Sequence, residues 1–195
     1  MNLFSLKLKN KFSKDRVSVG LDIGTSTIKV VKIKFSKETT ELYDFNLEPT
    51  SIDLEPVLKR ISESSDTKNI NISVCGPSVI IRYVNFPKMN NVELKQALKF
   101  EAQKHIPFSI AEVNLDAYIL KPELADNKML VLLAAVKKEF ITQRLKSFEA
   151  AGLNVNTIDI DSLALINAFN FNYSSDDNLK IKLSLCLISE RHLVI

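Results

Sequence analysis

Apolar and polar residues alternate in the first third of the chain, and this pattern predicts a run of short strands. Apolar side chains occupy every second position over residues 17–23, the period of half-buried strands, and Ile28, Val30 or Val31, and Ile33 resume this pattern after a turn. A third strand is expected next, with Leu42 buried and Tyr43 and Phe45 as further candidates for burial. Three strands joined by short turns form a meander, which argues against a dinucleotide-binding βαβ unit, as does the absence of a G-x-G-x-x-G motif.

Beyond this meander the spacing of apolar residues changes repeatedly between the period of helices and that of strands. A helical stripe of apolar residues begins near Ser51, and a second helix, capped by Asn90 or Asn91, is expected to end near His105 because a proline follows at position 107. The remaining expected elements are strands at 69–75, 79–86, 112–120, 128–136, 153–160 and 181–187, and helices at 137–151 and 161–171.

The turn between the first two strands carries a polar cluster that could hold an anion. It consists of Asp22, Gly24, Thr25, Ser26, Thr27 and Lys29. Glycine lets the backbone fold sharply, and the freed N–H groups, the hydroxyls and the lysine ammonium offer several donors to one phosphate. Asp22 is then placed to hold a Mg²⁺-bound water. Taken alone, the same residues are equally consistent with an ordinary hairpin turn.

Two resemblances add to this interpretation. The segment from Asp22 to Lys29 resembles the first phosphate-binding segment of the actin/Hsp70/FtsA superfamily. The motifs at 92–108, 112–116 and 130–136, followed by Ala150-Ala-Gly-Leu153, resemble the PilM family of type IV pilus assembly proteins. This resemblance implies an α/β (α+β) fold, with an actin-like, ribonuclease H-like first domain that carries an inserted SHS2/FtsA-type subdomain.

The same resemblance divides the chain into a tail and two subdomains. Residues 1–16 form a basic tail, residues 17–66 and 137–195 form the actin-like subdomain, and residues 67–136 form the inserted SHS2-like subdomain.

A PilM relative is expected to continue into a second actin-like domain, with a second phosphate loop and an adenosine-binding glycine pair. Residues 185–195 contain no glycine, and the whole chain has only four. The resemblance therefore leads us to expect that the second domain is missing from this sequence. An unfinished sheet edge at residues 193–195 would then be an exposed pairing surface, covered by a partner or by a second copy.

The resemblance also implies a cytoplasmic scaffold, peripheral at the inner membrane. PilM proteins bind the short cytoplasmic N-terminal segment of a PilN-type bitopic membrane protein and join the assembly platform to the pilus assembly ATPase. No short motif marks the peptide groove in this sequence. By placement alone, we expect it to be lined by Val79, Ile81, Tyr83, Phe86, Leu94, Leu98 and Phe108.

With a single phosphate loop, the chain is expected to bind ATP/Mg weakly or not at all, and no pair of residues stands out as nucleophile and base. We therefore expect that it is not an enzyme. Two alternatives stay open: a nucleotide-dependent ATPase or switch completed by a missing domain or a second chain, and an FtsA-like polymerising membrane tether. A counterpart in a type II secretion system and a homo-oligomer are also open at this stage.

Charge and composition argue against several other classes of protein, namely nucleic-acid-binding, membrane-spanning and secreted proteins. The formal charge of +3 comes from the tail, where five basic residues face one acidic residue, while the remainder has 21 basic and 22 acidic residues. A basic tail on a neutral body does not indicate a nucleic-acid-binding face. No apolar run has the length of a membrane span or of a signal peptide. Cys75 and Cys186 lie far apart without metal-ligand spacing, which is typical of reduced cytosolic thiols.

Overall fold

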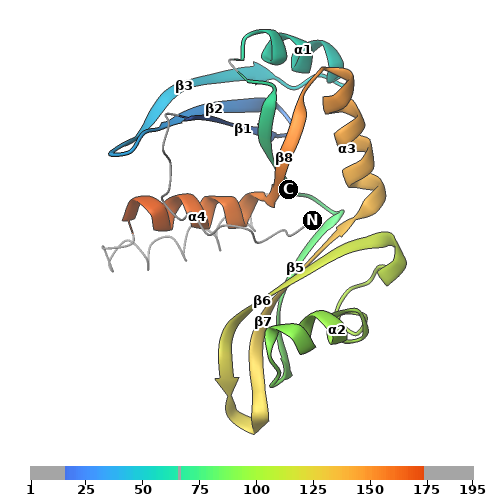
Figure 1. Ribbon diagram of the computed structural model, residues 1–195. Helices are drawn as coiled ribbons and strands as arrows, with labels where there is room; N and C mark the ends of the chain where they lie inside the picture. Colours follow the sequence, from blue (N-terminus) through green and yellow to red (C-terminus); the bar gives the residue numbers. More distant parts are fainter. Residues whose placement is uncertain (1–15, 66, 174–195) are drawn as a thin grey trace.

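The computed structural model describes residues 16–65 and 67–173, which form two β-sheets with their helices (Figure 1). The basic tail up to residue 15, the expected strand at 181–187 and the expected open edge at 193–195 lie outside the described residues.

The larger sheet is built from β1 (Arg16–Ile23), β2 (Thr27–Phe35), β3 (Thr40–Pro49), β4 (Asn69–Val74) and β8 (Asn154–Ile160). Its strand order is β3-β2-β1-β4-β8. The first three strands form the predicted antiparallel meander, whereas β4 and β8 run parallel to β1. The carboxyl ends of β1, β4 and β8 therefore meet at one edge of the sheet, the edge where ligands of open α/β sheets bind.

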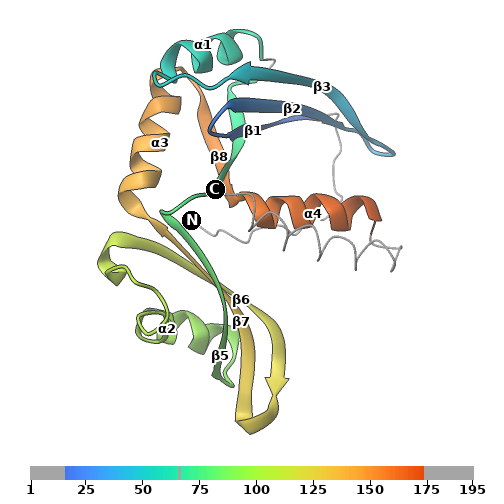
Figure 2. The same ribbon diagram turned by 180° about the vertical axis from the view of Figure 1, so that it is seen from behind.

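Three helices pack on this sheet: α1 (Glu55–Glu63), α3 (Lys138–Ala150) and α4 (Asp161–Tyr173). α1 and α3 cover one face, and α4 crosses the other (Figures 1 and 2). Val19 and Leu21 point to the first face, because alternate residues of a strand share a face, and both are buried. They pack in one core with Leu58 of α1 and Phe148 of α3, which are both 0% exposed.

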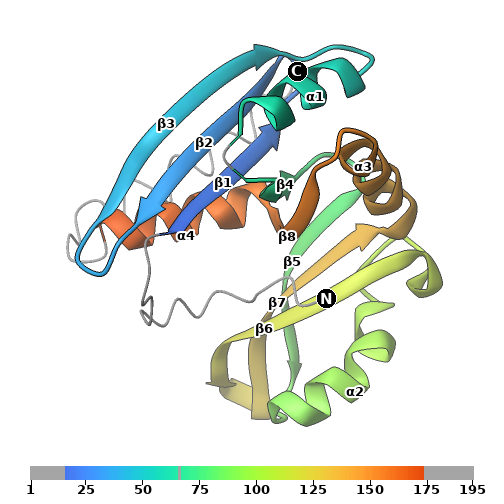
Figure 3. The same cartoon turned by 45° about the horizontal axis from the view of Figure 1, so that its top comes forward.

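The smaller sheet is built from β5 (Val79–Pro87), β6 (Val113–Leu124) and β7 (Lys128–Lys137), and helix α2 (Asn91–Ala102) packs on it. Short 3₁₀ turns at Ile110–Glu112 and Ala125–Asn127 precede and follow β6. The strand order is β5-β7-β6, so the middle strand is the last in sequence. α2 covers one face of this sheet (Figure 3).

The start of α2 follows from its local sequence. The Asn90 side chain accepts the N–H groups of Val92 and Glu93, and the Glu93 carboxylate accepts the Asn90 N–H in return. This capping box satisfies backbone donors that have no partner within the helix. The helix ends at Ala102, slightly before the predicted end near His105.

The two sheets share part of one core. Ala134 of β7 is 0% exposed and packs in the core of the larger sheet, together with Val79 and Ile81 of β5. One boundary differs from the sequence interpretation, which placed residues 67–136 in the inserted subdomain. Residues 69–74 form β4, which pairs with β1 and β8 in the larger sheet, so the separate three-stranded unit begins at Val79.

The burial expected for β3 is wrong. Leu42, Tyr43 and Phe45 are 65%, 56% and 64% exposed. β3 is the edge strand of the larger sheet, with a neighbouring strand on one side only. The alternation of its sequence predicted a strand correctly but could not show whether either face would be covered.

Candidate phosphate loop and partner surface

The polar cluster forms the tight turn between β1 and β2. The Gly24 N–H donates to the Thr27 carbonyl oxygen at 3.1 Å, which closes a turn with Thr25 and Ser26 at its exposed tip. A Cβ atom on Gly24 would lie 2.9 Å from that carbonyl oxygen. Position 24 therefore has no room for a side chain, and the turn keeps the hydroxyls of Thr25 and Ser26 directed away from the core.

Thr50, which sequence reasoning missed, holds this turn from the other side. Its hydroxyl donates to the Gly24 carbonyl oxygen at 2.9 Å, and its N–H donates to the Ser26 carbonyl oxygen at 3.0 Å. Thr50 directly follows β3, so the meander returns the chain to the loop. A lone threonine after a strand carries no sequence signal for this role.

Asp22 and Lys29 face each other across the hairpin. They are direct cross-strand partners, and the Lys29 Nζ lies 2.7 Å from one Asp22 carboxylate oxygen. The other Asp22 oxygen accepts a hydrogen bond from the Ser73 hydroxyl of β4 at 3.1 Å. Both groups remain partly exposed, 52% for Lys29 and 38% for Asp22. The lysine is therefore held beside the turn in a pair that an incoming anion would have to share or open.

Three further ionisable groups gather near the carboxyl ends of β1, β4 and β8. Cys75 follows β4, Asp161 follows β8, and Arg144 reaches in from α3. Burial raises the pKa of the Cys75 thiol, and a hydrogen bond and negative charge from Asp161 raise it further. Cys75 is thus a thiol and not a reactive thiolate.

Arg144 brings a second cation to this edge. Burial lowers the pKa of its guanidinium, while the charges of Cys75 and Asp22 act in the opposite direction. The guanidinium also lies 5.5 Å from the centre of the Phe140 ring.

Hydroxyl and N–H donors, Lys29 and a held carboxylate are the groups that a phosphate and its Mg²⁺ shell require. The residues present therefore fit the phosphate end of a nucleotide.

The seven residues expected to line the partner groove do not share a surface. Phe86 and Leu94 are 0% and 3% exposed in the core between α2 and its sheet, and Leu98 and Phe108 pack against the same core. Val79, Ile81 and Tyr83 point to the opposite face, since alternate strand residues face opposite sides.

That opposite face carries an apolar row of its own. Tyr83 of β5, Leu132 of β7 and Tyr118 of β6 are aligned across the three strands. Tyr83 is 64% exposed and Tyr118 is 55% exposed, and they flank Leu132, which is 6% exposed. Asp116 lies on the same face, and its Oδ2 is buried without a hydrogen-bond partner in the described part of the chain. We refer to Tyr83, Asp116, Tyr118 and Leu132 as the open face.

Comparison with known protein families shows to which family the chain belongs. The sequence profile described as type IV pilus assembly protein PilM matches residues 20–188, most of the chain. The chain belongs to the PilM family. The resemblance found in the sequence is thereby confirmed.

Solved structures agree with this assignment. A PilM-PilN type IV pilus biogenesis complex matches with 27% identity and a TM-score of 0.65, over 77% of this chain and 50% of that chain. The cytoplasmic domain of EpsL, an inner-membrane component of the type II secretion system of Vibrio cholerae, matches with 16% identity and a TM-score of 0.54, over 77% of this chain and 59% of that one. The predicted mixed α/β, actin-like fold class is confirmed.

A third structure, a Bacteroides thetaiotaomicron protein of actin-like ATPase fold, matches with 16% identity and a TM-score of 0.41, over 80% of this chain and 56% of that one; at that score it adds nothing to the argument. The chain thus spans between half and three-fifths of the length of these relatives. Among the described residues no helix is long and apolar enough to cross a membrane.

Proposed function

We propose that this chain is a cytoplasmic scaffold of a type IV pilus inner-membrane assembly platform, and that its open face binds the N-terminal peptide of a PilN-type membrane protein. The observation that carries the proposal is the row of Tyr83, Leu132 and Tyr118, which presents two exposed rings on either side of a buried leucine. Aromatic side chains of this kind are typical anchors for a peptide because they offer large contact area at low cost in conformational entropy. Membership of the PilM family and the match to a PilM-PilN complex support the choice of partner.

Asp116 gives this face a polar contact for the peptide backbone or for an amide side chain. A buried carboxylate oxygen without a partner costs free energy, and a donor from a ligand would remove that cost. The open face therefore combines apolar contact area with one acceptor, which suits an apolar segment that carries a single well-placed donor. Held in this way at a membrane protein, the chain would be peripheral at the inner membrane and within reach of the pilus assembly ATPase.

The phosphate loop supports a second candidate, a nucleotide-dependent switch. Gly24, Thr50 and the Asp22–Lys29 pair preserve a loop that fits a phosphate and Mg²⁺. We nevertheless propose weak or no binding of ATP/Mg and no hydrolysis by this chain, because Lys29 is already paired and the loop contacts only the phosphate end of a nucleotide.

Calorimetric titration tests both candidates. A synthetic N-terminal peptide of a PilN-type protein is titrated into the wild type, Tyr118→Ala and Tyr43→Ala. Tyr43 is a matched control, since it is a 56% exposed tyrosine on β3. We expect Tyr118→Ala to weaken binding about tenfold or more and Tyr43→Ala to leave it unchanged. Equal binding by all three proteins would refute the open face as the peptide site.

Titration with Mg-ATP then separates a scaffold from a switch. Clear peptide binding without ATP heat supports the scaffold. Micromolar ATP binding that is lost in Lys29→Ala, and that changes the peptide affinity, would replace the scaffold by the nucleotide-dependent switch.

A further inference from the structure

The free edge of β5 lies beside a pocket that shares only Tyr83 with the open face. This open pocket of about 490 Å³ is lined by four consecutive strand residues and the end of the α2 segment: Arg82, Tyr83, Val84, Asn85, Lys104 and His105. Several domains bind an extended peptide as an additional strand at an exposed sheet edge of this kind, with pockets beside the edge for alternate side chains.

The pairing of β5 with β7 shows which backbone groups are free at this edge. The Lys137 N–H donates to the Ser78 carbonyl at 3.0 Å, and the Lys88 N–H donates to the Asn127 carbonyl at 2.9 Å. Hydrogen-bonded pairs alternate along an antiparallel ladder, so the even-numbered residues of β5 bond to β7. The N–H and carbonyl groups of Ile81, Tyr83 and Asn85 therefore point away from the sheet, and no described residue pairs with them there.

Two other edge strands, β3 and β6, are less regular than β5. On β3 the Asn46 side chain accepts the Leu47 N–H at 2.8 Å, and the pairing of β3 with β2 shifts register between Lys32 and Ile33. On β6 the pairing register shifts twice, around Lys121, and the strand contains Pro122. Prolines and irregular pairing prevent the addition of further strands. β5 keeps regular pairing from Val79 to Pro87, with its proline only at the end.

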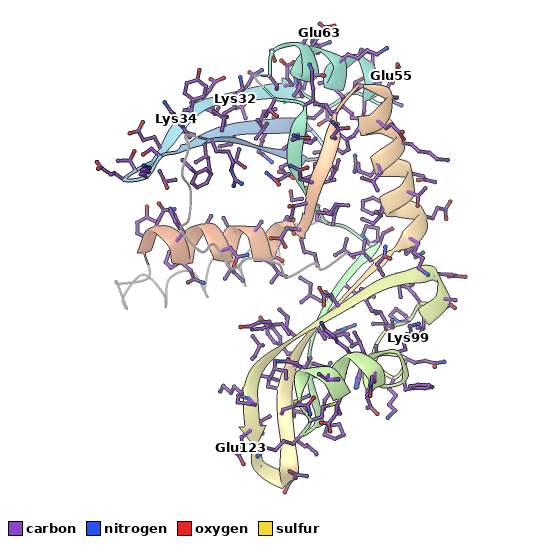
Figure 4. The ribbon with its side chains drawn as sticks, in the orientation of Figure 1. Lys32, Lys34, Glu55, Glu63, Lys99 and Glu123 are labelled. Atoms are coloured by element: carbon purple, nitrogen blue, oxygen red, sulfur yellow. The ribbon has the colours of Figure 1, made fainter. Side chains whose placement is uncertain are left out.

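The charge beside the edge is positive. Arg82 projects to the α2 side of the sheet and has no ion-pair partner among residues 16–65 and 67–173. Lys104 is exposed and shares its charge with Glu101 at 3.0 Å, and His105 stacks on Phe86 with ring centres 6.1 Å apart. Lys99 is a further cation on α2, the helix that precedes Lys104 and His105 (Figure 4). The ion pairs described for the smaller sheet and α2 are Lys88–Glu123 and Lys104–Glu101. Of these two carboxylates, only Glu101 contacts a residue that lines the pocket.

We propose that the β5 edge binds an extended acidic segment of a partner protein by strand addition. The backbone of that segment pairs with Ile81, Tyr83 and Asn85, and its carboxylates, two residues apart, face Arg82 and Lys104. A strand presents alternate residues on one side, so an acidic residue at every second position meets these cations while the intervening residues lie beside Tyr83. Charge-assisted hydrogen bonds to an arginine are stronger than neutral ones, and Arg82 is therefore the main determinant of charge preference.

A fluorescein-labelled peptide of alternating acidic and apolar residues, Thr-Glu-Val-Glu-Val-Glu-Thr, provides the test by fluorescence anisotropy. Its lysine counterpart, Thr-Lys-Val-Lys-Val-Lys-Thr, is the control ligand. We expect the wild type to bind the acidic peptide at least about tenfold more tightly than the lysine peptide. The variant Arg82→Glu/Lys104→Glu should reverse that preference, while Lys37→Glu/Lys146→Glu, with the same change in net charge, should leave it unchanged.

Asn85→Pro tests the strand addition itself. The Asn85 N–H does not bond to β7, so proline is compatible with this edge position but removes a donor that the added strand needs. We expect this variant to lose binding of the acidic peptide and to keep binding of the PilN-type peptide. Amide shifts in ¹⁵N-labelled protein should be confined to β5 and the end of the α2 segment.

Three results would overturn the proposal. The first is equal binding of the acidic and lysine peptides by the wild type. The second is unchanged binding by Arg82→Glu/Lys104→Glu. The third is wild-type self-association in sedimentation that these substitutions abolish, because the occupant would then be a second copy of this chain.

Discussion

Gly24 allows a sharp test of the phosphate loop, because a single methyl group is enough to disturb it. In Gly24→Ala, the added Cβ would lie 2.9 Å from the Thr27 backbone oxygen and 3.5 Å from the Lys29 Nζ. The lysine end can move aside, but the oxygen is held by the hydrogen bond from the Gly24 N–H. The turn must therefore open and weaken that bond.

The expected loss can be estimated from this contact. Overpacking of a fixed site costs about 1–3 kcal/mol, and the smaller entropy of an unfolded chain with alanine returns about 0.4–1 kcal/mol. We therefore expect Gly24→Ala to lower the free energy of unfolding by about 1–2 kcal/mol, measured by urea denaturation with circular dichroism.

Gly20→Ala is the matched control for this prediction. A Cβ on Gly20 has its closest neighbour at 3.9 Å, the Val31 carbonyl oxygen, which is an ordinary contact. The same glycine-to-alanine change in β1 should thus leave stability unchanged or raise it by up to about 1 kcal/mol. If both variants were equally stable, the steric account of the loop would be wrong.

Three further substitutions test the fold around this loop. Thr50→Val removes the hydroxyl that donates to the Gly24 carbonyl, and urea denaturation should show a loss of about 1 kcal/mol. Phe148→Ala empties a side chain that is 0% exposed, and the same measurement should show a loss of about 3–5 kcal/mol; a loss below about 1 kcal/mol would contradict its place in the core. Burial raises the pKa of Asp159 above its ordinary value of 3.8, so its ionised form is disfavoured in the folded state. The stability of Asp159→Asn relative to the wild type should therefore increase as the pH rises from below 3.8 through the folded-state pKa, and a pH-independent difference would refute the burial argument.

The local part of the fold and of the loop could be predicted from the sequence. Once residues 24–27 form a tight turn, the antiparallel ladder places Asp22 opposite Lys29. The alternation in β1 and β2 likewise predicts which residues enter the core. These features depend on neighbours in the chain, and for that reason pattern and turn chemistry suffice.

The long-range part could not be predicted in this way. Thr50 reaches the loop because the meander closes on itself, and β4 joins the larger sheet because it pairs with strands that lie far away in sequence. The seven residues expected to line one peptide groove do not share a surface, and the reason is different. Strand periodicity separates Tyr83 from Phe86 onto opposite faces of β5, and a list based on proximity in sequence combined the two faces.

The three-stranded unit is connected to the larger sheet by two segments that lie side by side. The chain enters it after β4, leaves it from β7 into α3, and a hydrogen bond of 3.0 Å between the Lys137 N–H and the Ser78 carbonyl joins the two crossings. Ala134, Val79 and Ile81 pack in the core of the larger sheet beside these crossings, so a load applied to this unit by a tethered partner would reach the rest of the molecule at two points together, the end of β4 beside Ser73 and the first turn of α3.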